Sequence, residues 1–468
     1  MSLQIIILAA GQGKRMYSTK PKVLHTLAGQ PMLRHVINTA QQLKPEAIYV
    51  VYGHGGEQVK QELNDLEVSW ILQEEQLGTG HAVKQVLPYL SLTSNVLILA
   101  GDVPLIQAET LQKLIVNTQY NSNVEPRTLA LLVAQFPDPT GLGRIIRDDT
   151  GAIQTIVEEK DATTEQKQVK EIYTGVCCAQ AKDLARWLPL LNNNNAQHEY
   201  YLTQIISLAV SEGYNLTSFM VEDILEVQGV NTKLQLQQLE RAFQRKQAEQ
   251  LLLKGTFIVD ANRIDIRGEL ICGKDVFIDV NCVFIGKVIL HNGCSIGPNC
   301  VLSNVTIDEG SEIYANSVLE DCEIGKQCHI GPFARLRPGT QLGPRCKIGN
   351  FVEAKKAIFA EGSKANHLSY LGDVTLGKEV NVGAGTITCN YDGVNKHQTI
   401  IEDGAFIGSD TQLVAPVKVG AYATVGAGST IRKNVPPGEL TICESKQKTI
   451  IGWKRPVKKK GNSSSEVS

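Results

Sequence analysis

The sequence predicts two halves of different construction: an α/β half with a mostly parallel sheet, and an all-β half that forms a parallel β-helix. Three observations predict this division. In the first half, apolar strand-like runs alternate with helix-like segments, which is typical of parallel sheets flanked by helices. After Gly255, aliphatic residues recur at every sixth position, the signature of a β-helix built from hexapeptide repeats. A long amphipathic segment lies between the two patterns.

The first half contains four short apolar runs that we expect to be strands. They are Ile5–Ala9, Ile48–Tyr52, Val96–Leu99 and Leu129–Ala134. Pro31 opens a segment between the first two, where proline suits the first turn of a helix. Its apolar residues have the spacing of one buried helix face: Leu33, Val36, Ile37 and Ala40.

The segment from Thr232 to Lys254 predicts a single long helix, which Gly255 ends. Its apolar residues fall roughly on one face: Leu236, Leu239, Phe243 and Leu251. A helix of this length spans roughly 30 Å and is able to separate two domains. We therefore expect a first domain at 1–233, a helical linker at 234–254, and a β-helix domain at 255–468 with a short basic tail.

Two uninterrupted ladders carry the β-helix prediction. They are Ile324, Ile330, Leu336, Leu342 and Ile348, and then Ile407, Leu413, Val419, Val425 and Ile431. Glycine often follows the aliphatic residue, where a small side chain suits a corner. The stretch from Phe351 to Val374 breaks the period, and we expect a polar insertion there that carries a functional site.

The bulk properties exclude several classes of protein. A net charge of −2 gives no global attraction to nucleic acid or acidic membranes. The opening residues do not read as a signal peptide, and the run Ile5–Leu8 is too short to cross a bilayer. The eleven cysteines include no Cys-x-x-Cys pair, so we interpret them as small buried residues in a reducing compartment. We expect a cytoplasmic protein.

The first candidate site is the glycine-rich segment Leu8–Met16, which follows a predicted strand. Glycines let the backbone approach a phosphate, while Arg15 and Lys22 add positive charge. The segment is neither a dinucleotide fingerprint nor a P-loop, because position 16 is Met and the Gly-Lys-Ser/Thr ending is absent. An ordinary strand–helix turn is the alternative.

Asp102 stands at the carboxyl end of another predicted strand, where ligands bind in open α/β sheets. Taken alone, such an aspartate is as often a helix cap as a Mg²⁺ ligand. Other residues of the first half favour the Mg²⁺ ligand over the helix cap. They are Gln73, Gly78, Thr79, Gly143, Glu158 and Asn231.

These motifs resemble two known families. The glycine-rich opening, Leu77–Gly80, Gly101-Asp102, Gly141–Arg144 and Gly229–Asn231 resemble the sugar-phosphate nucleotidyltransferases, which have a Rossmann-like sheet. The hexapeptide half resembles the left-handed β-helix acyltransferases. Both halves in one chain resemble the bacterial bifunctional N-acetylglucosamine-1-phosphate uridyltransferases and glucosamine-1-phosphate N-acetyltransferases, over residues 3 to 460.

The resemblance implies two reactions with glucosamine 1-phosphate, acetyl-CoA and UTP as substrates. The amine is acetylated first, and N-acetylglucosamine 1-phosphate then takes UMP to give UDP-N-acetylglucosamine, a peptidoglycan and lipopolysaccharide precursor. Asp102 and Asn231 would hold Mg²⁺, while Arg15 and Lys22 would stabilise charge on the α-phosphate. The remaining nucleotide and sugar residues would be Leu8, Ala9, Ala10, Gly11, Gln73, Gly78, Thr79, Gly101, Gly143, Glu158 and Tyr173.

Acetyl transfer requires a neutral amine, and a histidine is suited to take its proton near neutral pH. By resemblance His367 is this general base, although a surface-loop histidine is the usual interpretation of a His taken alone. The sugar phosphate would bind Arg335, Lys355, Tyr370 and Asn381. The acetyl-CoA groove would be lined by Ala384, Asn390, Tyr391, Ser409, Ala427 and Glu444. The resemblance also implies a homotrimer.

The sequence departs from the family pattern at two positions. Tyr173 replaces an asparagine that would hydrogen-bond the sugar nucleotide, and Glu444 replaces an arginine that would pair with a CoA phosphate. Two alternatives therefore stay open. One is a single-activity nucleotidyltransferase with a regulatory β-helix, and the other is a non-catalytic regulatory subunit. His367 with Lys355, Tyr370 and Asn381 speaks against the first alternative, and Arg15, Lys22, Asp102 and Asn231 together speak against the second.

Overall fold

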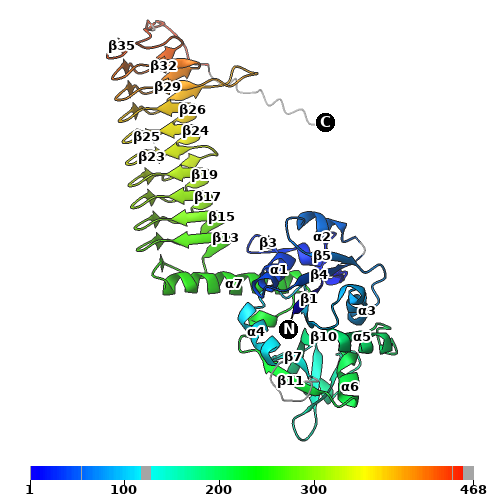
Figure 1. The fold of residues 1–468 in the computed structure, drawn as a ribbon. Helices are drawn as coiled ribbons and strands as arrows, with labels where there is room; N and C mark the ends of the chain where they lie inside the picture. Colours follow the sequence, from blue (N-terminus) through cyan, green and yellow to red (C-terminus); the bar gives the residue numbers. More distant parts are fainter. Residues whose placement is uncertain (1, 54, 118–127, 445, 457–468) are drawn as a thin grey trace, which may run out of the picture. The chain divides into compact units, whose positions relative to one another are not determined.

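The structure is a computed structural model and describes all residues except 1, 54, 118–127, 445 and 457–468 (Figure 1). The chain forms two compact units, Met1–Asn304 and Val305–Ser468, each described below by itself. The predicted basic tail, Lys458–Lys460, lies outside the described residues. Within the described ranges, no helix has the length and apolar character that crossing a bilayer requires.

A nine-stranded sheet forms the centre of the first unit, with a main order β11-β7-β10-β6-β1-β4-β5. The strands are β1 (Leu3–Leu8), β4 (Ala47–Tyr52), β5 (Ser69–Leu72), β6 (Asn95–Ala100), β7 (Thr128–Gln135), β8 (Gly143–Arg147), β9 (Ile153–Val157), β10 (Glu171–Gln180) and β11 (Asn215–Met220). The four strands predicted from the sequence are confirmed as β1, β4, β6 and β7. Pairing around β1 is parallel, while β10 is antiparallel to its neighbours.

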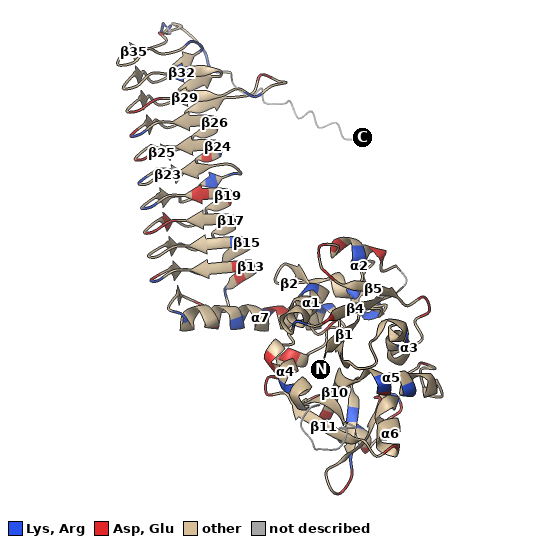
Figure 2. Ribbon diagram, viewed as in Figure 1, with Lys and Arg blue, Asp and Glu red and all other residues tan. Residues whose placement is uncertain are grey.

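Helices cover both faces of this sheet, as an α/β fold requires (Figure 1). They are α1 (Met32–Gln42), α2 (Glu57–Glu62), α3 (Thr79–Lys84), α4 (Ala108–Asn117), α5 (Ala181–Trp187) and α6 (Gln204–Ser211). One apolar core joins the sheet to α1 and α4, and a second joins it to α3, α5 and α6. Acidic and basic residues share elements, as on α2, in keeping with the small net charge (Figure 2).

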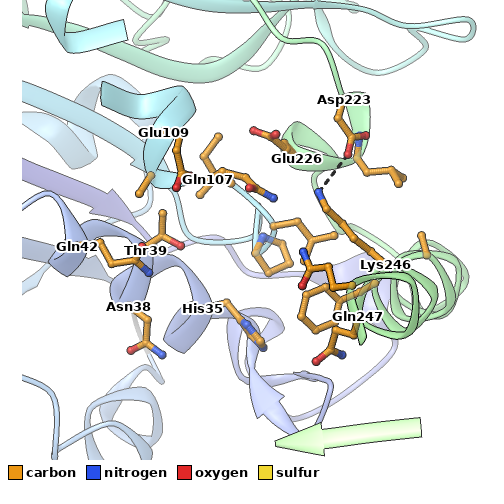
Figure 3. A pocket seen from close by; sticks show the side chains of 18 residues that line it. His35, Asn38, Thr39, Gln42, Gln107, Glu109, Asp223, Glu226, Lys246 and Gln247 are labelled. Atoms are coloured by element: carbon orange, nitrogen blue, oxygen red, sulfur yellow. Dashed lines mark hydrogen bonds and ion pairs between the residues drawn. The ribbon is translucent and has the colours of Figure 1, made fainter. Parts of the chain in front are cut away.

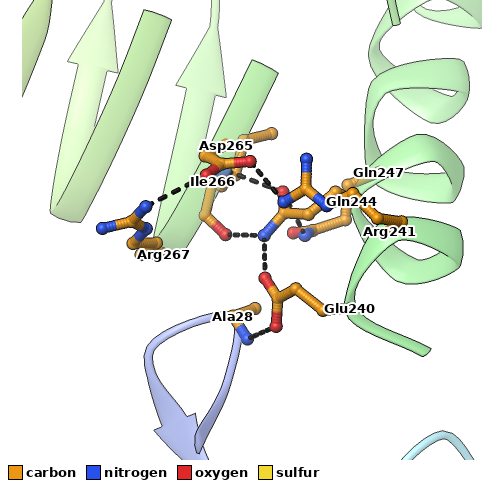
Figure 4. A network of polar contacts seen from close by, with 8 residues as sticks. All are labelled: Ala28, Glu240, Arg241, Gln244, Gln247, Asp265, Ile266 and Arg267. Carbon is orange, nitrogen blue, oxygen red and sulfur yellow. Dashed lines mark hydrogen bonds and ion pairs between the residues drawn. The ribbon is translucent and has the colours of Figure 1, made fainter. Parts of the chain in front are cut away.

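Helix α7 (Lys233–Leu253) confirms the predicted long helix. Thr232 caps its start, and Gln235 completes a capping box. Its buried face includes Gln244, whose amide hydrogen-bonds the backbone of Ile266 twice: it donates to the carbonyl at 2.8 Å and accepts from the N–H at 2.7 Å (Figure 4). Glu240 in turn accepts from the Ala28 N–H at 2.7 Å. The helix is therefore tied to both the sheet domain and the first β-helix coil.

The first coils of the β-helix belong to the first unit. Their strands are β12 (Phe257–Ile258), β13 (Ile264–Cys272), β14 (Phe277–Ile278), β15 (Cys282–Leu290) and β16 (Ser295–Ile296), and the boundary between the units falls within β17 (Val301–Ile307). Pairing is parallel and in register, as in Ile264 with Cys282. Equivalent residues on successive coils, such as Asn281 and Asn299, lie 18 apart. This is three hexapeptide repeats per coil.

The second unit continues with the same parallel construction. Its strands are β18 (Glu312–Ile313), β19 (Val318–Ile324), β20 (His329–Ile330), β21 (Arg335–Leu336), β22 (Gln341–Leu342), β23 (Lys347–Asn350), β24 (Glu353–Phe359), β25 (Lys364–His367), β26 (Tyr370–Leu376), β27 (Asn381–Val382), β28 (Ile387–Cys389), β29 (Thr399–Ile401), β30 (Phe406–Ile407), β31 (Gln412–Val414), β32 (Val417–Val419), β33 (Thr424–Val425), β34 (Thr430–Ile431) and β35 (Leu440–Thr441). All ten residues of the two aliphatic ladders are buried, which confirms the β-helix prediction. None of the eleven cysteines forms a disulfide.

The expected insertion between Phe351 and Val374 is wrong. These residues form β24, β25 and part of β26, which pair in register with their neighbours. The period breaks because this coil is one residue shorter: Asn350 pairs with His367, 17 residues later. The true insertion follows β28, because Asn381 pairs with Phe406, a much longer step. An exposed loop at 390–398 accounts for it.

Candidate active sites

The first site is a cavity of about 810 Å³ within the first unit, at one edge of the sheet. Strands β1 and β6 are parallel, with Leu8 paired to Ala100, so the segments that follow them emerge at the same edge. The cavity brings together residues predicted from distant parts of the sequence. They are Leu8, Ala9, Ala10, Gly11, Arg15, Lys22, Gln73, Gly78, Thr79, Asp102, Gly143, Glu158, Tyr173 and Asn231.

Two glycines of the predicted set shape this wall by their lack of a side chain. Gly78 has φ 108°, and a Cβ there would lie 2.7 Å from the Tyr200 carbonyl oxygen. Gly101 is buried behind the cavity, where a Cβ would lie 3.0 Å from the Leu8 carbonyl oxygen. Gly78 therefore needs both its conformation and its size, and Gly101 allows two loops to approach closely.

Lys22, Asp102 and Asn231 converge inside the cavity. The Lys22 ammonium forms an ion pair with Asp102 and donates to the Asn231 Oδ1 at 3.1 Å. The side chains of Lys22 and Asp102 are only 12% and 20% exposed. One cationic group therefore already lies between a carboxylate oxygen and an amide oxygen.

The chemistry of this donor set fits Mg²⁺, which prefers a few protein oxygens and completes its shell with water and phosphate. Among the residues that the structure describes, no group of three or more His, Cys, Asp or Glu side chains forms a metal site. A site with one carboxylate and one amide agrees with both points, since a nucleotide triphosphate would supply the remaining ligands.

The far end of the cavity holds Glu158 and Tyr173. Glu158 accepts a hydrogen bond from the Thr203 hydroxyl at 3.1 Å. Burial raises the pKa of its carboxyl, and the charges of Asp161 and Glu199 add to the effect. Burial also raises the pKa of Tyr173, and the neighbouring Cys177 adds to the effect. The tyrosine that replaces the expected asparagine is therefore part of the cavity wall.

A second cavity, of about 550 Å³, lies between α1, the segment before α4, and α7 (Figure 3). None of the site residues predicted from the sequence lines it. Three of its charged groups already have partners: Lys246 pairs with Asp223 at 3.3 Å, and Glu226 accepts from the Thr110 hydroxyl at 2.6 Å. These pairings are those of a packed interface between helices, and we assign no chemistry to it.

The second site lies on the β-helix of the second unit. Parallel pairing stacks Arg335 on Glu353 and Glu353 on Tyr370, on three successive coils. Lys355 is paired with Gly372 in the same two strands. Two of the predicted phosphate residues, Lys355 and Tyr370, are therefore placed on adjoining coils, while Asn381 pairs with Lys364 in the other sheet.

Two cations that the sequence analysis missed lie beside Lys355. The ammonium of Lys396 lowers the pKa of Lys355 most strongly, and Arg337 adds to the effect. Arg337 itself forms an ion pair with Glu353 at 2.7 Å, which raises its pKa, and Tyr370 adds to this effect. Arg335 is likewise paired with a glutamate, Glu320, but it is not among the groups that shift the pKa of Lys355. Lys355, Lys396 and Arg337 together form a group of three cations suited to a phosphate dianion.

His367 ends β25 and is exposed to solvent. Its Nδ1 lies 3.0 Å from the Asn350 Oδ1 on the preceding coil. Because an amide oxygen only accepts hydrogen bonds, this contact places a proton on Nδ1. The other nitrogen, Nε2, is then the basic one, as a general base requires.

Three of the six residues predicted for acetyl-CoA, Ala384, Ser409 and Ala427, recur at equivalent positions of the β-helix. Ala384, Ser409 and Ala427 each follow a glycine on three successive coils, and a Cβ on the glycine before Ala384 would lie 2.6 Å from the Ser409 nitrogen. Asn390 is buried and donates to Asp373 at 2.5 Å, whereas Tyr391 and Glu444 are exposed. The column of small residues leaves room for an extended ligand.

Comparison with known proteins agrees with this division. Residues 5–139 match the MobA-like NTP transferase domain, and residues 321–355 and 398–433 match the bacterial transferase hexapeptide (six repeats). The chain is 67% identical to the bifunctional protein GlmU of Legionella pneumophila subsp. pneumophila (strain Philadelphia 1), over 98% of this chain and 99% of the relative. It is 55% identical to the GlmU of Marinobacter nauticus over 97% and 99%, and 53% identical to that of Nitrosospira multiformis over 98% of each.

Full-length identity at this level, together with both domain matches, establishes the relationship that the two sites suggest. The chain belongs to the family of the bifunctional protein GlmU.

Proposed function

We propose that this enzyme makes UDP-N-acetylglucosamine in two steps at two separate sites. The β-helix site transfers an acetyl group from acetyl-CoA to the amine of glucosamine 1-phosphate. The sheet-edge cavity then transfers UMP from UTP to N-acetylglucosamine 1-phosphate and releases pyrophosphate. The observation that carries the proposal is the convergence of fourteen predicted residues, from Leu8 to Asn231, on one cavity.

In the acetyl step, the cations around Lys355 hold the sugar phosphate, and His367 removes the proton from the amine. The nucleophilic nitrogen attacks the thioester carbonyl, and CoA leaves as the thiolate. The Asn350 contact keeps His367 in the tautomer that accepts a proton at Nε2. Ala384, Ser409 and Ala427 line the groove for the CoA arm.

In the uridylyl step, a phosphate oxygen of the sugar attacks the α-phosphorus of UTP in line with the pyrophosphate leaving group. Arg15 and Lys22 offset the negative charge that develops, and Glu158 and Gly143 hold the sugar end. Asp102 and Asn231 would hold Mg²⁺, which would supply positive charge to offset the negative charge of the phosphates. No covalent enzyme intermediate is required.

The same proposal covers features beyond the two reactions. We divide the chain into the uridylyltransferase domain at 1–233, the linker at 234–254 and the acetyltransferase domain at 255–468. We further propose a homotrimer, which suits an open β-helix surface, and a cytoplasmic location, which suits eleven cysteines that form no disulfide. The product feeds peptidoglycan and lipopolysaccharide synthesis.

Product analysis tests the proposal. Purified protein is incubated with glucosamine 1-phosphate, acetyl-CoA, UTP and Mg²⁺, and the products are separated by chromatography. Formation of UDP-N-acetylglucosamine is expected. Uridylylation of N-acetylglucosamine 1-phosphate without acetylation of glucosamine 1-phosphate would instead support the single-activity alternative with a regulatory β-helix.

A further inference from the structure

Asn231 occupies a junction between the cavity and α7. Its side-chain oxygen accepts from Lys22, and the preceding residue, Val230, donates its N–H to the Asp102 carbonyl at 3.0 Å. The next residue, Thr232, is the N-cap of α7. The backbone that carries Asn231 is therefore held to the end of β6 on one side and to a helix on the other.

Gln235, in the first turn of α7, makes contacts that a helix cap does not require. Its side-chain oxygen accepts from the Thr232 N–H at 3.1 Å, as in a capping box. The same oxygen accepts from the Asn231 N–H at the shorter distance of 2.8 Å. These two N–H groups belong to the two peptide groups that flank the Asn231 Cα atom.

Holding both flanking peptide groups fixes the two backbone torsions of Asn231, because each peptide group is planar and rigid. The direction of the Cα–Cβ bond follows from those torsions. The Asn231 side chain then has little freedom except rotation about its own bonds, and Lys22 restricts that rotation by its bond to Oδ1. The Gln235 oxygen therefore affects the orientation of the Asn231 side chain, which lines the cavity, although Gln235 itself does not line it.

We propose that Gln235 is a positioning residue for the uridylyl step. Its amide oxygen orients the Asn231 Oδ1 toward the position between Asn231 and Asp102, where the Lys22 ammonium lies in this structure and where the metal ion would bind. This inference rests on the proposed uridylyl transfer and on Asn231 as a ligand of the metal. The competing explanation is that Gln235 only stabilises the start of α7.

The capping box supplies a matched control for that explanation. The Thr232 hydroxyl accepts from the Gln235 N–H at 3.2 Å, which is the other half of the same box. Thr232→Ala weakens the helix start but leaves the Gln235 oxygen on Asn231. Gln235→Met removes the oxygen at similar length, and Gln235→Glu restores an acceptor at the same place.

The experiment compares the three full-length variants with the parent protein in two assays. Mn²⁺ binding in the presence of UTP is followed by electron paramagnetic resonance of free Mn²⁺, without turnover. The Mg²⁺ concentration for half-maximal uridylyl transfer is measured separately, with acetyl transfer by the same preparation as the internal control. Thermal unfolding shows how far each variant weakens the fold.

Gln235→Met is expected to weaken Mn²⁺ binding and raise the Mg²⁺ requirement about 3- to 10-fold, the scale of one lost hydrogen bond. Thr232→Ala and Gln235→Glu are expected to stay within about twofold of the parent. Equal shifts in Gln235→Met and Thr232→Ala, or no shift in Gln235→Met, would overturn the inference. A parent protein that transfers no UMP would overturn the proposed function itself, which is a different result.

Discussion

The two sites are built on opposite principles. In the first unit, loops from several parallel strands meet at one sheet edge and enclose a cavity, where Lys22 and Asp102 are mostly buried and already paired. On the β-helix, the stacked coils present side chains in columns on an open surface, where His367 is exposed and Tyr391 is 60% exposed. A solenoid face does not curve around a ligand by itself. The acetyl site therefore depends on projecting segments, such as the loop at 390–398, or on other subunits.

Replacing His367 by Ala gives the largest expected effect. Loss of a general base should slow acetyl transfer about 10²- to 10⁴-fold while uridylyl transfer stays unchanged. The two rates are measured separately on one preparation. Asn350→Ala, which leaves the imidazole but removes its partner, should have a smaller effect. An acetyl rate unaffected by His367→Ala would exclude His367 as the base.

Asp102→Ala is expected to give the opposite pattern, in which uridylyl transfer is impaired and acetyl transfer is retained. Loss of the carboxylate removes a metal ligand and leaves Lys22 without its ion pair, so uridylyl transfer should fall about 10²- to 10³-fold. Acetyl transfer should be unchanged. If both activities fell together, the two sites would not be independent.

Removing a cation next to Lys355 gives the next largest expected effect. Arg337→Met should raise the KM for glucosamine 1-phosphate about tenfold, which corresponds to one charge-assisted hydrogen bond. Arg335→Met, whose guanidinium pairs with Glu320, serves as the comparison. A larger effect at Arg335 than at Arg337 would support the prediction made from the sequence over the geometry.

The raised pKa of Glu158 predicts that the activity of the first site, and not that of the second, depends on pH through this carboxyl. Burial raises its pKa, so as the pH falls its carboxylate is protonated sooner than an exposed glutamate would be. The charged acceptor for a sugar or ribose hydroxyl is then lost. The KM of the uridylyl step should rise a few-fold as the pH falls, at a higher pH than an exposed glutamate would give, and Glu158→Gln should flatten that rise. An identical profile in Glu158→Gln would contradict this.

Glu444→Arg gives the smallest expected effect. Exchange of an exposed negative charge for a positive one should lower the KM for acetyl-CoA about two- to fivefold, and added salt should reduce the gain. Steady-state kinetics at two ionic strengths measures it. If KM does not change, Glu444 lies outside the CoA site.

Periodic features of the fold were predictable from the sequence, and features that arise between coils were not. The aliphatic ladders and the four strands follow from repeats of six and from apolar runs, and all are confirmed. A coil shortened by one residue looked like an insertion, because a shift of period and an added loop break the pattern in the same way. The real loop at 390–398 carries polar residues without a distinctive motif.

All the residues predicted for the nucleotide site except Gly101 line the sheet-edge cavity, because they belong to short motifs at strand ends, whereas half of the residues that line the cavity were not predicted as site residues. Arg337 and Lys396 were missed because they approach Lys355 only through the stacking of coils and the fold of a loop. A signal was present for one of them: Arg335 and Arg337 flank the buried Leu336 and are both candidates for the outer surface. Gln235 had a signal in the Thr-x-x-Gln spacing, although its bond to Asn231 required coordinates.

The paired bonds of Gln244 to Ile266 also matter for the open end of the β-helix. A side-chain amide that donates to a carbonyl and accepts from the N–H of the same residue imitates the strand of a preceding coil. The first strand of a solenoid otherwise exposes backbone groups that invite another chain to add on. Helix α7 thus covers the first strand and hinders end-to-end association of β-helices. A β-helix fragment that begins after Gly255 would lack this cover and would be prone to associate end to end.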